Sequence, residues 1–468
     1  MATQAASEVD GGPQVFRHTP FDDAQTHVRL LRFVSKHEDD VRLEISTWTR
    51  PELPKDEGED EHEWRLWHDR RRPYETLTFH AISYTWGDEK DQRQIKINGL
   101  AFTVRRNCFE AMAKVRLHYP DEYFWIDSIC INQGDDVEKS AQVAMIYETF
   151  CGAERVLACL GDLCMVRDTT GMKNHYKSSD PEGPAIFAHD RDGPTLDSNT
   201  LADTPSHAAH TLESRIREAL PHGDISLSHL SRNEKLHPIC QPWVDSLTFS
   251  TAQSLRHGLW SFLVQEYWSR VWIMPEIAAA GDDLQLLVGT AKVNSLHIHL
   301  LMMLAGGRGG SDKHHINFNK LDVSRIWGEH KPPRLHDEYI SDGCRVAMGT
   351  IARKQTESLS DSLLGSRGKR CSDPRDRIYA LLPIMHSHVP FRPDYSKSCF
   401  KLAVEAFGYV RVHEAHEGEF FTIIALALEV DEDDLARALG LDGTLNDEIE
   451  RFRKESRERR VKERREKE

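Results

Sequence analysis

The sequence predicts an α/β protein built on a parallel sheet with a β-hairpin insertion, followed by a mainly helical C-terminal region. Two observations lead to this fold class. Between residues 77 and 161, short apolar runs alternate with helical patterns, and such alternation is typical of right-handed βαβ crossovers. From about residue 334 to 450, the sequence has mainly helical periodicity.

The elements of the predicted sheet follow one another closely. Leu77–Tyr84 alternates and ends in an apolar run, which predicts a strand. Asn98-Gly99 separates two further strand-like runs, and both residues suit the positive φ angles of a two-residue hairpin turn. The remaining patterns predict a helix over 107–118, a strand over 123–127, a helix over 135–149 and a strand over 155–160.

A polar stretch over residues 162–242 interrupts this pattern. It is rich in Gly, Pro, Asp, Ser and His and has no sustained period, so we expect a partly disordered insertion. Ordered patterns then return, and they predict helices over 244–267 and near 270–280, a strand over 284–289, and a helix that Asn294 caps. Further helices are expected over 345–358, 373–383 and 399–412.

The length of 468 residues suggests two or three folded units. We expect a lead-in over 1–76 with two short strands, at 27–34 and 41–48. The main α/β domain then covers 77–292, including the insertion. The domain is followed by a mainly helical region over 293–450 and a charged helical tail over 451–468.

Composition excludes several classes of protein. Hydrophobic residues make up 39% of the chain, which is enough for a core, and no apolar run approaches the ~20 residues that a membrane helix needs. The net charge of -15 argues against nucleic-acid binding, which needs clustered Lys and Arg. The first residues have no apolar stretch of the signal-peptide type, and the nine cysteines include no CxxC pair. We therefore expect a cytoplasmic protein that binds neither nucleic acid nor membranes.

The 25 histidines do not predict a metal site. The pairs His297/His299, His314/His315 and His386/His388 have no Cys or carboxylate partners at zinc spacing. His413-Glu414-Ala415-His416 is one residue short of the HExxH pattern. We expect neither a metal nor a permanently bound cofactor.

Three separated blocks resemble the heterokaryon incompatibility (HET) domain of fungi, in the order typical of that family. They are His80-Ala-Ile-Ser-Tyr-Thr-Trp-Gly-Asp88, Phe124-Trp-Ile-Asp-Ser-Ile-Cys-Ile-Asn-Gln133 and Trp268-Ser-Arg-Val-Trp-Ile-Met-Pro-Glu276. Two later segments, Asp373–Leu382 and Pro393–Tyr395, resemble sequences that follow such domains. The resemblance covers residues 77–290 well and 373–396 in part.

This resemblance implies a fungal protein of self/non-self recognition that triggers growth arrest or cell death. Its implied partners are a second copy of the chain or other incompatibility proteins. The family is distantly similar to TIR domains, which have a flavodoxin-like parallel sheet and, in some members, cleave NAD. NAD is therefore the implied substrate.

Candidate site residues follow from the predicted strands themselves. In an open parallel sheet, ligands bind at the carboxyl ends of the strands. Polar and aromatic residues lie at two such ends, namely Ser83, Tyr84, Trp86, Asp88 and Asp127. We expect them to share one ligand site.

Cleavage of the nicotinamide–ribose bond passes through an oxocarbenium-like state, which a nearby carboxylate stabilises. Glu276 is the candidate for this catalytic role, because Trp272-x-x-x-Glu276 resembles the TIR block that carries the catalytic glutamate. Trp86, Tyr84 and Trp272 are candidates for stacking on a base. Asp127 and Ser83 could bond to ribose or phosphate groups.

Structural roles are the alternative for the same residues. Glu276 follows Pro275, which suits the first position of a helix, and a first-turn carboxylate is stabilised by the helix dipole whatever its function. Trp268 and Trp272 lie four residues apart and could both pack in the core. The alternative function is accordingly a signalling and oligomerisation module that triggers cell death by recruiting partners, without chemistry of its own.

Overall fold

A computed structural model gives the structure of the chain in several stretches. It describes residues 14–35, 40–50, 78–161, 198–219, 236–263, 265–304, 321–327, 359–366, 369–385, 392–413 and 417–440. The helix predicted over 345–358 and the charged tail predicted over 451–468 lie outside these stretches.

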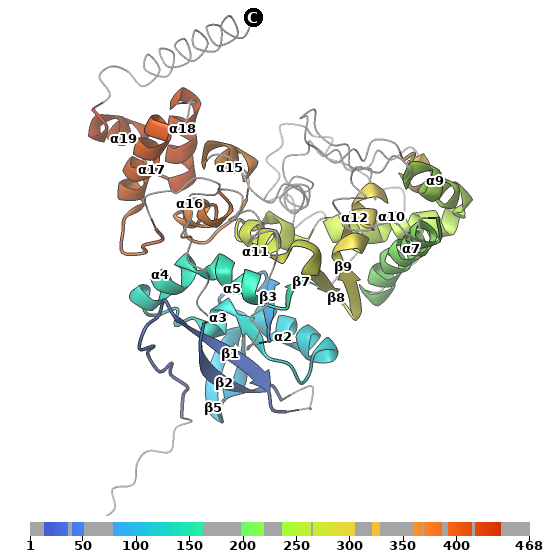
Figure 1. The fold of residues 1–468 in the computed structure, drawn as a ribbon, viewed down its shortest axis with the longest axis horizontal. Helices are drawn as coiled ribbons and strands as arrows, with labels where there is room; N and C mark the ends of the chain where they lie inside the picture. Colours follow the sequence, from blue (N-terminus) through green and yellow to red (C-terminus); the bar gives the residue numbers. More distant parts are fainter. Residues whose placement is uncertain are drawn as a thin grey trace, which may run out of the picture.

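The described part of the chain is organised around a nine-stranded mixed sheet with the order β5-β4-β2-β1-β6-β3-β7-β8-β9 (Figure 1). The strands are β1 (His27–Phe33), β2 (Arg42–Thr49), β3 (His80–Tyr84), β4 (Gln92–Ile97), β5 (Leu100–Arg105), β6 (Phe124–Ile126), β7 (Arg155–Cys159), β8 (Leu284–Val288) and β9 (Ala291–Asn294). The α/β class predicted from the sequence is thereby confirmed.

The sheet is parallel only in part, which corrects the prediction of a parallel sheet. The neighbours β6-β3-β7-β8 are parallel, as the βαβ pattern indicated. On one side, β1 pairs antiparallel with both β6 and β2. On the other, β9 turns back on β8 through Gly289, whose φ is 55°. The sheet therefore extends beyond its parallel centre in both directions.

The predicted hairpin is present. Strands β4 and β5 pair antiparallel with Ile97 opposite Leu100, and the turn residues Asn98 and Gly99 have φ angles of 51° and 81°. These are the left-handed conformations that the Asn-Gly pair was expected to supply. Strand β4 also pairs with β2, which lies in the segment assigned to a lead-in. The N-terminal strands are thus built into the same sheet as the HET-like blocks.

Four helices connect the first strands, namely α2 (Arg106–His118), α3 (Asp127–Cys130), α4 (Asp136–Ala144) and α5 (Ile146–Gly152). Helix α4 begins after Asp135, whose side chain accepts hydrogen bonds from the backbone N–H groups of Val137 and Glu138. The single helix predicted over 135–149 is therefore two helices, and the break between them falls at Met145.

Two of the described helices lie wholly or partly within the stretch 162–242, where the sequence has no sustained period. Helix α7 (Ser198–Ala219) and the start of α9 (Leu236–Ser246) lie in that stretch. The buried residues Ala209, Leu212 and Ile216 of α7 follow helical spacing. This narrow apolar face was hidden by the polar residues around it. Helix α7 packs on α10 (Phe249–Leu263) and on α12 (Ser295–Leu304), the helix predicted after Asn294.

The C-terminal helices form a separate group beside the sheet (Figure 1). They are α15 (Leu359–Gly365), α16 (Asp376–Tyr379), α17 (Cys399–His413), α18 (Glu417–Leu428) and α19 (Glu432–Ala438). The helix predicted over 399–412 is thus confirmed as α17. The one predicted over 373–383 is reduced to the single turn of α16 and the 3-10 helix η3 (Leu382–Ile384).

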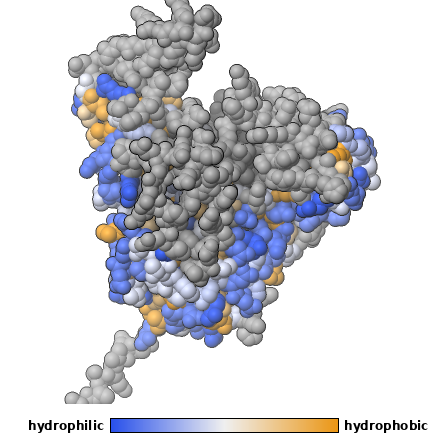
Figure 2. Space-filling view, viewed as in Figure 1, coloured by the Kyte–Doolittle hydropathy of each residue, from blue (hydrophilic) through white to orange (hydrophobic). Residues whose placement is uncertain are grey.

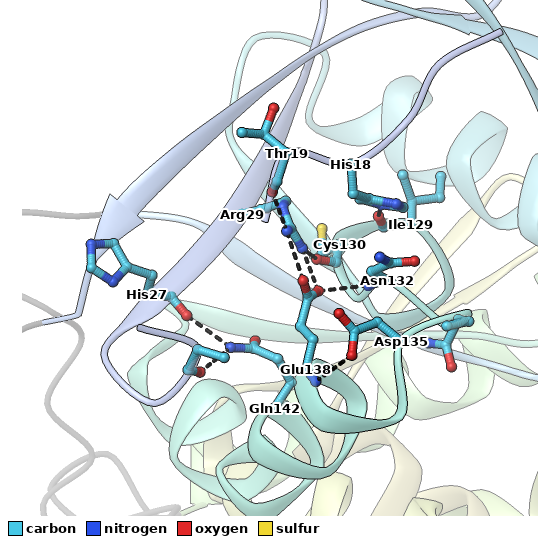
Figure 3. A network of polar contacts seen from close by, with 12 residues as sticks. His18, Thr19, His27, Arg29, Ile129, Cys130, Asn132, Asp135, Glu138 and Gln142 are labelled. Atoms are coloured by element: carbon cyan, nitrogen blue, oxygen red, sulfur yellow. Dashed lines mark hydrogen bonds and ion pairs between the residues drawn. The ribbon is translucent and has the colours of Figure 1, made fainter. Parts of the chain in front are cut away.

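A buried ion pair joins β1 to α4 (Figure 3). The guanidinium of Arg29 contacts both carboxylate oxygens of Glu138, at 2.6 and 2.9 Å. Arg29 also donates to the backbone oxygens of Thr19 and Cys130, while Glu138 accepts from the backbone N–H of Asn132. The two side chains are only 3% and 5% exposed, so water cannot stabilise their charges. Each charge is therefore compensated mainly by the other.

The surface of the described residues is predominantly hydrophilic on the face that Figure 2 shows, with hydrophobic residues in small separate groups. None of the described helices combines the length and the apolar character that crossing a bilayer requires.

Candidate functional site

A pocket of about 400 Å³ opens at the carboxyl ends of β3 and β6. Its walls are formed by the residues that follow the two strands, by Arg105 of β5, by residues of α4 and α5, and by the segment that enters helix α11 (Ile273–Ala280). A C-terminal wall, made of residues 370–373, Asp376 and Tyr395, completes the pocket. The charged and aromatic residues among them are Trp86, Asp88, Arg105, Asp127, Lys139, Glu266, Arg270, Trp272, Glu276, Arg370, Asp373, Asp376 and Tyr395.

Glu276 lies in this pocket wall, in the first turn of α11. Its carboxylate accepts a hydrogen bond from the Ser83 hydroxyl on β3 and lies 3.4 and 3.5 Å from the guanidinium nitrogens of Arg270. The residue is 3% exposed, and this burial raises the pKa of Glu276 to about 7, although Arg270 acts in the opposite direction. At neutral pH, both protonation states of the carboxyl are therefore accessible.

Ser83 positions the glutamate from the sheet. It is the fourth residue of β3 and is buried, and its hydroxyl also contacts the Tyr267 hydroxyl at 2.7 Å. Tyr267 belongs to the 3-10 helix η1 (Glu266–Ser269), directly before Arg270 and α11. The Ser83 hydroxyl thus connects β3 to the segment from η1 to α11 through two contacts, one with the Tyr267 hydroxyl and one with the Glu276 carboxylate.

Asp127 and Trp86 are brought together as the sequence indicated. The indole Nε1 of Trp86 donates to Asp127 Oδ2 at 2.8 Å, and the backbone N–H of Ser128 donates to Oδ1 at 2.7 Å. Burial raises the pKa of Asp127, while Arg270 lowers it. Two carboxyl groups therefore flank Arg270, one from the end of β6 and one from α11.

Tyr84 is close in sequence to these residues but does not line the pocket. It is 3% exposed, and its hydroxyl donates to Ser128 Oγ at 2.8 Å. A ring this deeply buried leaves no face open to a base, so the expectation that Tyr84 stacks on a ligand is corrected. Its position instead secures the backbone that presents Asp127.

Asp88 lies at the exposed rim of the pocket. Its Oδ1 accepts a hydrogen bond from the backbone N–H of Lys90 at 2.9 Å, which holds the loop after β3 in a tight turn. The other carboxylate oxygen has no bond of this kind among the described residues.

The two tryptophans of the third block have different environments. Trp268 is buried and donates from Nε1 to the Phe262 backbone oxygen at 2.8 Å, so it packs in the core. Trp272 is half-buried, lines the pocket and hydrogen-bonds to Asp376. Pro275 is the third helical residue rather than the first, a position where no intrahelical N–H bond is lost.

Several residues of the pocket wall were not found from the sequence. Arg270 lies inside the third block, and Asp373, Asp376 and Tyr395 lie in the two later segments that resemble family sequences. The family resemblance of those two segments indicated that they matter, but no sequence pattern predicted that they lie beside Glu276. The structure does so through a backbone bridge, in which Val271 N donates to Arg370 O at 3.0 Å.

The C-terminal wall is fixed by its own contacts. Tyr395 donates from its hydroxyl to Asp376 Oδ1 at 2.6 Å, and Lys139 lies over its ring at 4.3 Å. Arg375 pairs with Asp373 at 2.6 Å. Burial raises the pKa of Asp376, whereas hydrogen bonds from Tyr395 and Trp272 lower it.

Gly87 is the residue of the pocket wall with the tightest backbone requirement. Its φ is 76°, and a Cβ there would lie 2.6 Å from Asn107 Nδ2. We expect Gly87→Ala to lower the free energy of unfolding by about 1–3 kcal/mol more than Gly99→Ala. Gly99 has a similar φ of 81° but no neighbour within 4 Å, so its variant reports backbone strain alone. Denaturant unfolding measures both, and equal losses would show that the Asn107 contact has no effect.

The arrangement has the composition of a site for a polar ligand that carries rings. A buried carboxyl of adjusted pKa, an arginine and a second carboxyl converge, and the half-buried Trp86 and Trp272 contribute aromatic surface. The described histidine–carboxylate groups that could hold a metal lie outside this pocket.

Comparisons with known proteins agree with this location. Residues 79–276 match the family model of the heterokaryon incompatibility protein (HET), and this segment ends at Glu276. A stretch of 180 residues is 28% identical to heterokaryon incompatibility protein 6, OR allele, of Neurospora crassa. That alignment covers 34% of this chain and 23% of the relative, so the chain matches about a quarter of that protein's length. No solved structure matches the chain.

Proposed function

Because residues 79–276 are a heterokaryon incompatibility (HET) domain, we propose that the chain acts in fungal heterokaryon incompatibility. In this proposal it is a cell-death effector that cleaves NAD in the pocket beside Glu276. The observation that carries the chemical part is the convergence of Glu276, Asp127 and Trp86 on one pocket at the carboxyl ends of β3 and β6.

The strand order supports a flavodoxin-like, TIR-like centre for this domain. Counted along the chain, the parallel strands β3, β6, β7 and β8 are first to fourth, and their spatial order β6-β3-β7-β8 reads 2-1-3-4. This is the beginning of the flavodoxin order, in which ligands bind outside the carboxyl ends of the strands. The pocket lies at that edge.

The proposed reaction hydrolyses the bond between nicotinamide nitrogen and ribose C1′. The bonding electron pair leaves with nicotinamide, which loses its ring charge and departs neutral. Positive charge develops on the ribosyl group, and an ionised Glu276 beside it stabilises that charge. Water then adds to C1′ and releases a proton, so NAD and water give nicotinamide, ADP-ribose and H⁺.

The neighbours of Glu276 suit this role. Ser83 fixes the carboxylate direction, and Arg270 favours its ionised form. Trp86 and Trp272 line the same pocket and could hold a base or the nicotinamide ring against an aromatic face. Asp127 and Gln133 also lie in the wall, and in this proposal they bond to ribose hydroxyls.

One observation favours a second candidate. Glu276 contacts Ser83 and Arg270 at once, and these contacts join β3 to the start of α11. A carboxylate with these bonds could have a purely structural role, which is to hold β3 and α11 together. The chain would then act as a recruitment and self-association module that triggers cell death without chemistry.

Expression of the full chain in a fungal host separates the two candidates. The enzyme proposal expects the wild-type chain to arrest growth and to lower cellular NAD, and expects Glu276→Gln to do neither at equal protein level. Glu110→Gln is the matched control, because it makes the same change at a partly exposed surface pair with Arg106. Growth arrest that persists in Glu276→Gln with NAD unchanged would reject the enzyme and favour recruitment.

A further inference from the structure

We propose that His210, Glu213 and His297 form a binding site for a zinc-type divalent cation that joins helix α7 to helix α12. The three residues offer one ligand atom each, and these atoms all lie within 4.8 Å of one another. The site is separate from the pocket, whose walls contain none of the three.

Helix geometry brings the ligands together. His210 and Glu213 are three residues apart on α7 and therefore share a face, which packs against α12. His297 is the third residue of α12, and Asn294 Oδ1 accepts its backbone N–H at 2.8 Å. The imidazole Nε2 of His297 lies 2.6 Å from Glu213 Oε2, and the rings of His297 and His210 have their centroids 4.1 Å apart.

Burial and second contacts favour metal binding. His297 is 1% exposed, and its Nδ1 has no hydrogen-bond partner among the described residues. Arg217 holds the other carboxylate oxygen of Glu213 at 2.6 Å, and His210 is exposed, so solvent reaches the site from the α7 side.

The donor set indicates the class of cation. Two imidazoles and one carboxylate, with a fourth position open to water, are ligands that zinc accepts in a tetrahedral arrangement. A second group, formed by His80, Glu122 and Glu154, offers only one imidazole. The group on α7 and α12 is therefore the better zinc site.

The occupied site would fasten a helix of the 162–242 stretch to the helix that follows β9. Without a cation, the Glu213–His297 bond, the ring contact between His210 and His297 and apolar packing contribute to this connection at the site. Zinc would therefore stabilise the packing of α7 on α12, independently of any ligand in the pocket.

Zinc binding by the full chain tests the proposal. The purified protein is stripped with a chelator and titrated with Zn²⁺ against a chromogenic competitor, and Co²⁺ absorption reports tetrahedral coordination. The wild-type chain is expected to bind one more tight zinc than His210→Ala or Glu213→Gln. Affinity at that site should fall by at least about 100-fold in these variants, since loss of even an outer-shell partner costs about 10- to 100-fold.

The controls use the same residue types elsewhere. His207→Ala removes an exposed histidine one turn earlier on α7, and Glu122→Gln removes a ligand of the second group. Both are expected to keep the tight site and its Co²⁺ spectrum. The proposal is overturned if the wild-type chain binds no tight zinc, if His210→Ala and Glu213→Gln bind as the wild type does, or if Glu122→Gln alone removes the site.

Discussion

Glu276→Gln is expected to lower kcat/KM for NAD hydrolysis by about 10²- to 10⁴-fold, the range that a positioned acid or base contributes. Glutamine has nearly the same shape and can still contact Ser83, but it carries no charge to stabilise the ribosyl cation. Nicotinamide release by the purified full chain measures the effect. Glu110→Gln should retain wild-type turnover, and an equal loss in the two variants would contradict a specific role for Glu276.

The pH dependence of the same variant pair gives a second readout. If the ionised carboxyl is the active form, wild-type kcat/KM rises with pH through about 7 and then levels off, because burial raises the pKa of Glu276 to about 7. The residual rate of Glu276→Gln should lack this rise. A wild-type profile that is flat from pH 5 to 9 would mean that Glu276 does not titrate in the rate-limiting step.

The raised pKa also has a consequence for stability. A carboxyl that titrates at 4.5 in the unfolded chain and near 7 in the fold binds its proton more tightly when folded. Its contribution therefore favours the fold at low pH and declines as pH rises from about 4.5 to about 7. Glu276→Gln removes this decline, so the difference between the two proteins should change across that pH window.

Arg29→Met is expected to have the largest effect on stability, a loss of about 3–5 kcal/mol in the free energy of unfolding. It leaves the Glu138 carboxylate buried without its partner and removes two hydrogen bonds to backbone oxygens. Denaturant unfolding of the full chain measures the loss. Adding Glu138→Leu to this variant should restore part of it, since the orphaned charge is then removed.

Arg32→Met is the matched control for that experiment. Arg32 lies on the same strand, but it pairs with Glu44 on the surface, where the two side chains are 43% and 52% exposed. Exposed pairs contribute about 0–1 kcal/mol, so its variant should be near wild type. If the free energy of unfolding fell equally in Arg29→Met and Arg32→Met, burial of the Arg29–Glu138 pair would have no effect on its contribution to stability.

The sequence was informative where structure depends on neighbouring residues. The apolar strands β3 and β6, the Asn98-Gly99 turn and the cap at Asn294 all follow local rules, and each was predicted. Because strand ends follow from strands, Trp86 and Asp127 could be assigned to one edge of the sheet before any contact between them was known.

The remaining features depend on contacts between distant segments. Strand β1 has no local signal for its place between β2 and β6, and the face of α7 that carries Leu212 is apolar on too few residues to stand out. The C-terminal wall joins the pocket through the bridge between Arg270 and Arg370. Glu213 and His297 meet across 84 positions of sequence, so no spacing rule could have connected them.

The proposed chemistry is tested most directly by the products that the purified wild-type chain forms from NAD. Full-length protein is incubated with NAD at concentrations where light scattering has established its oligomeric state, and nicotinamide and ADP-ribose are quantified by chromatography. Hydrolysis beside Glu276 requires both products in equal molar amounts, increasing with time and enzyme. Unchanged NAD under these conditions, in the monomer and in any oligomer, would contradict the enzyme and leave recruitment as the function of the domain.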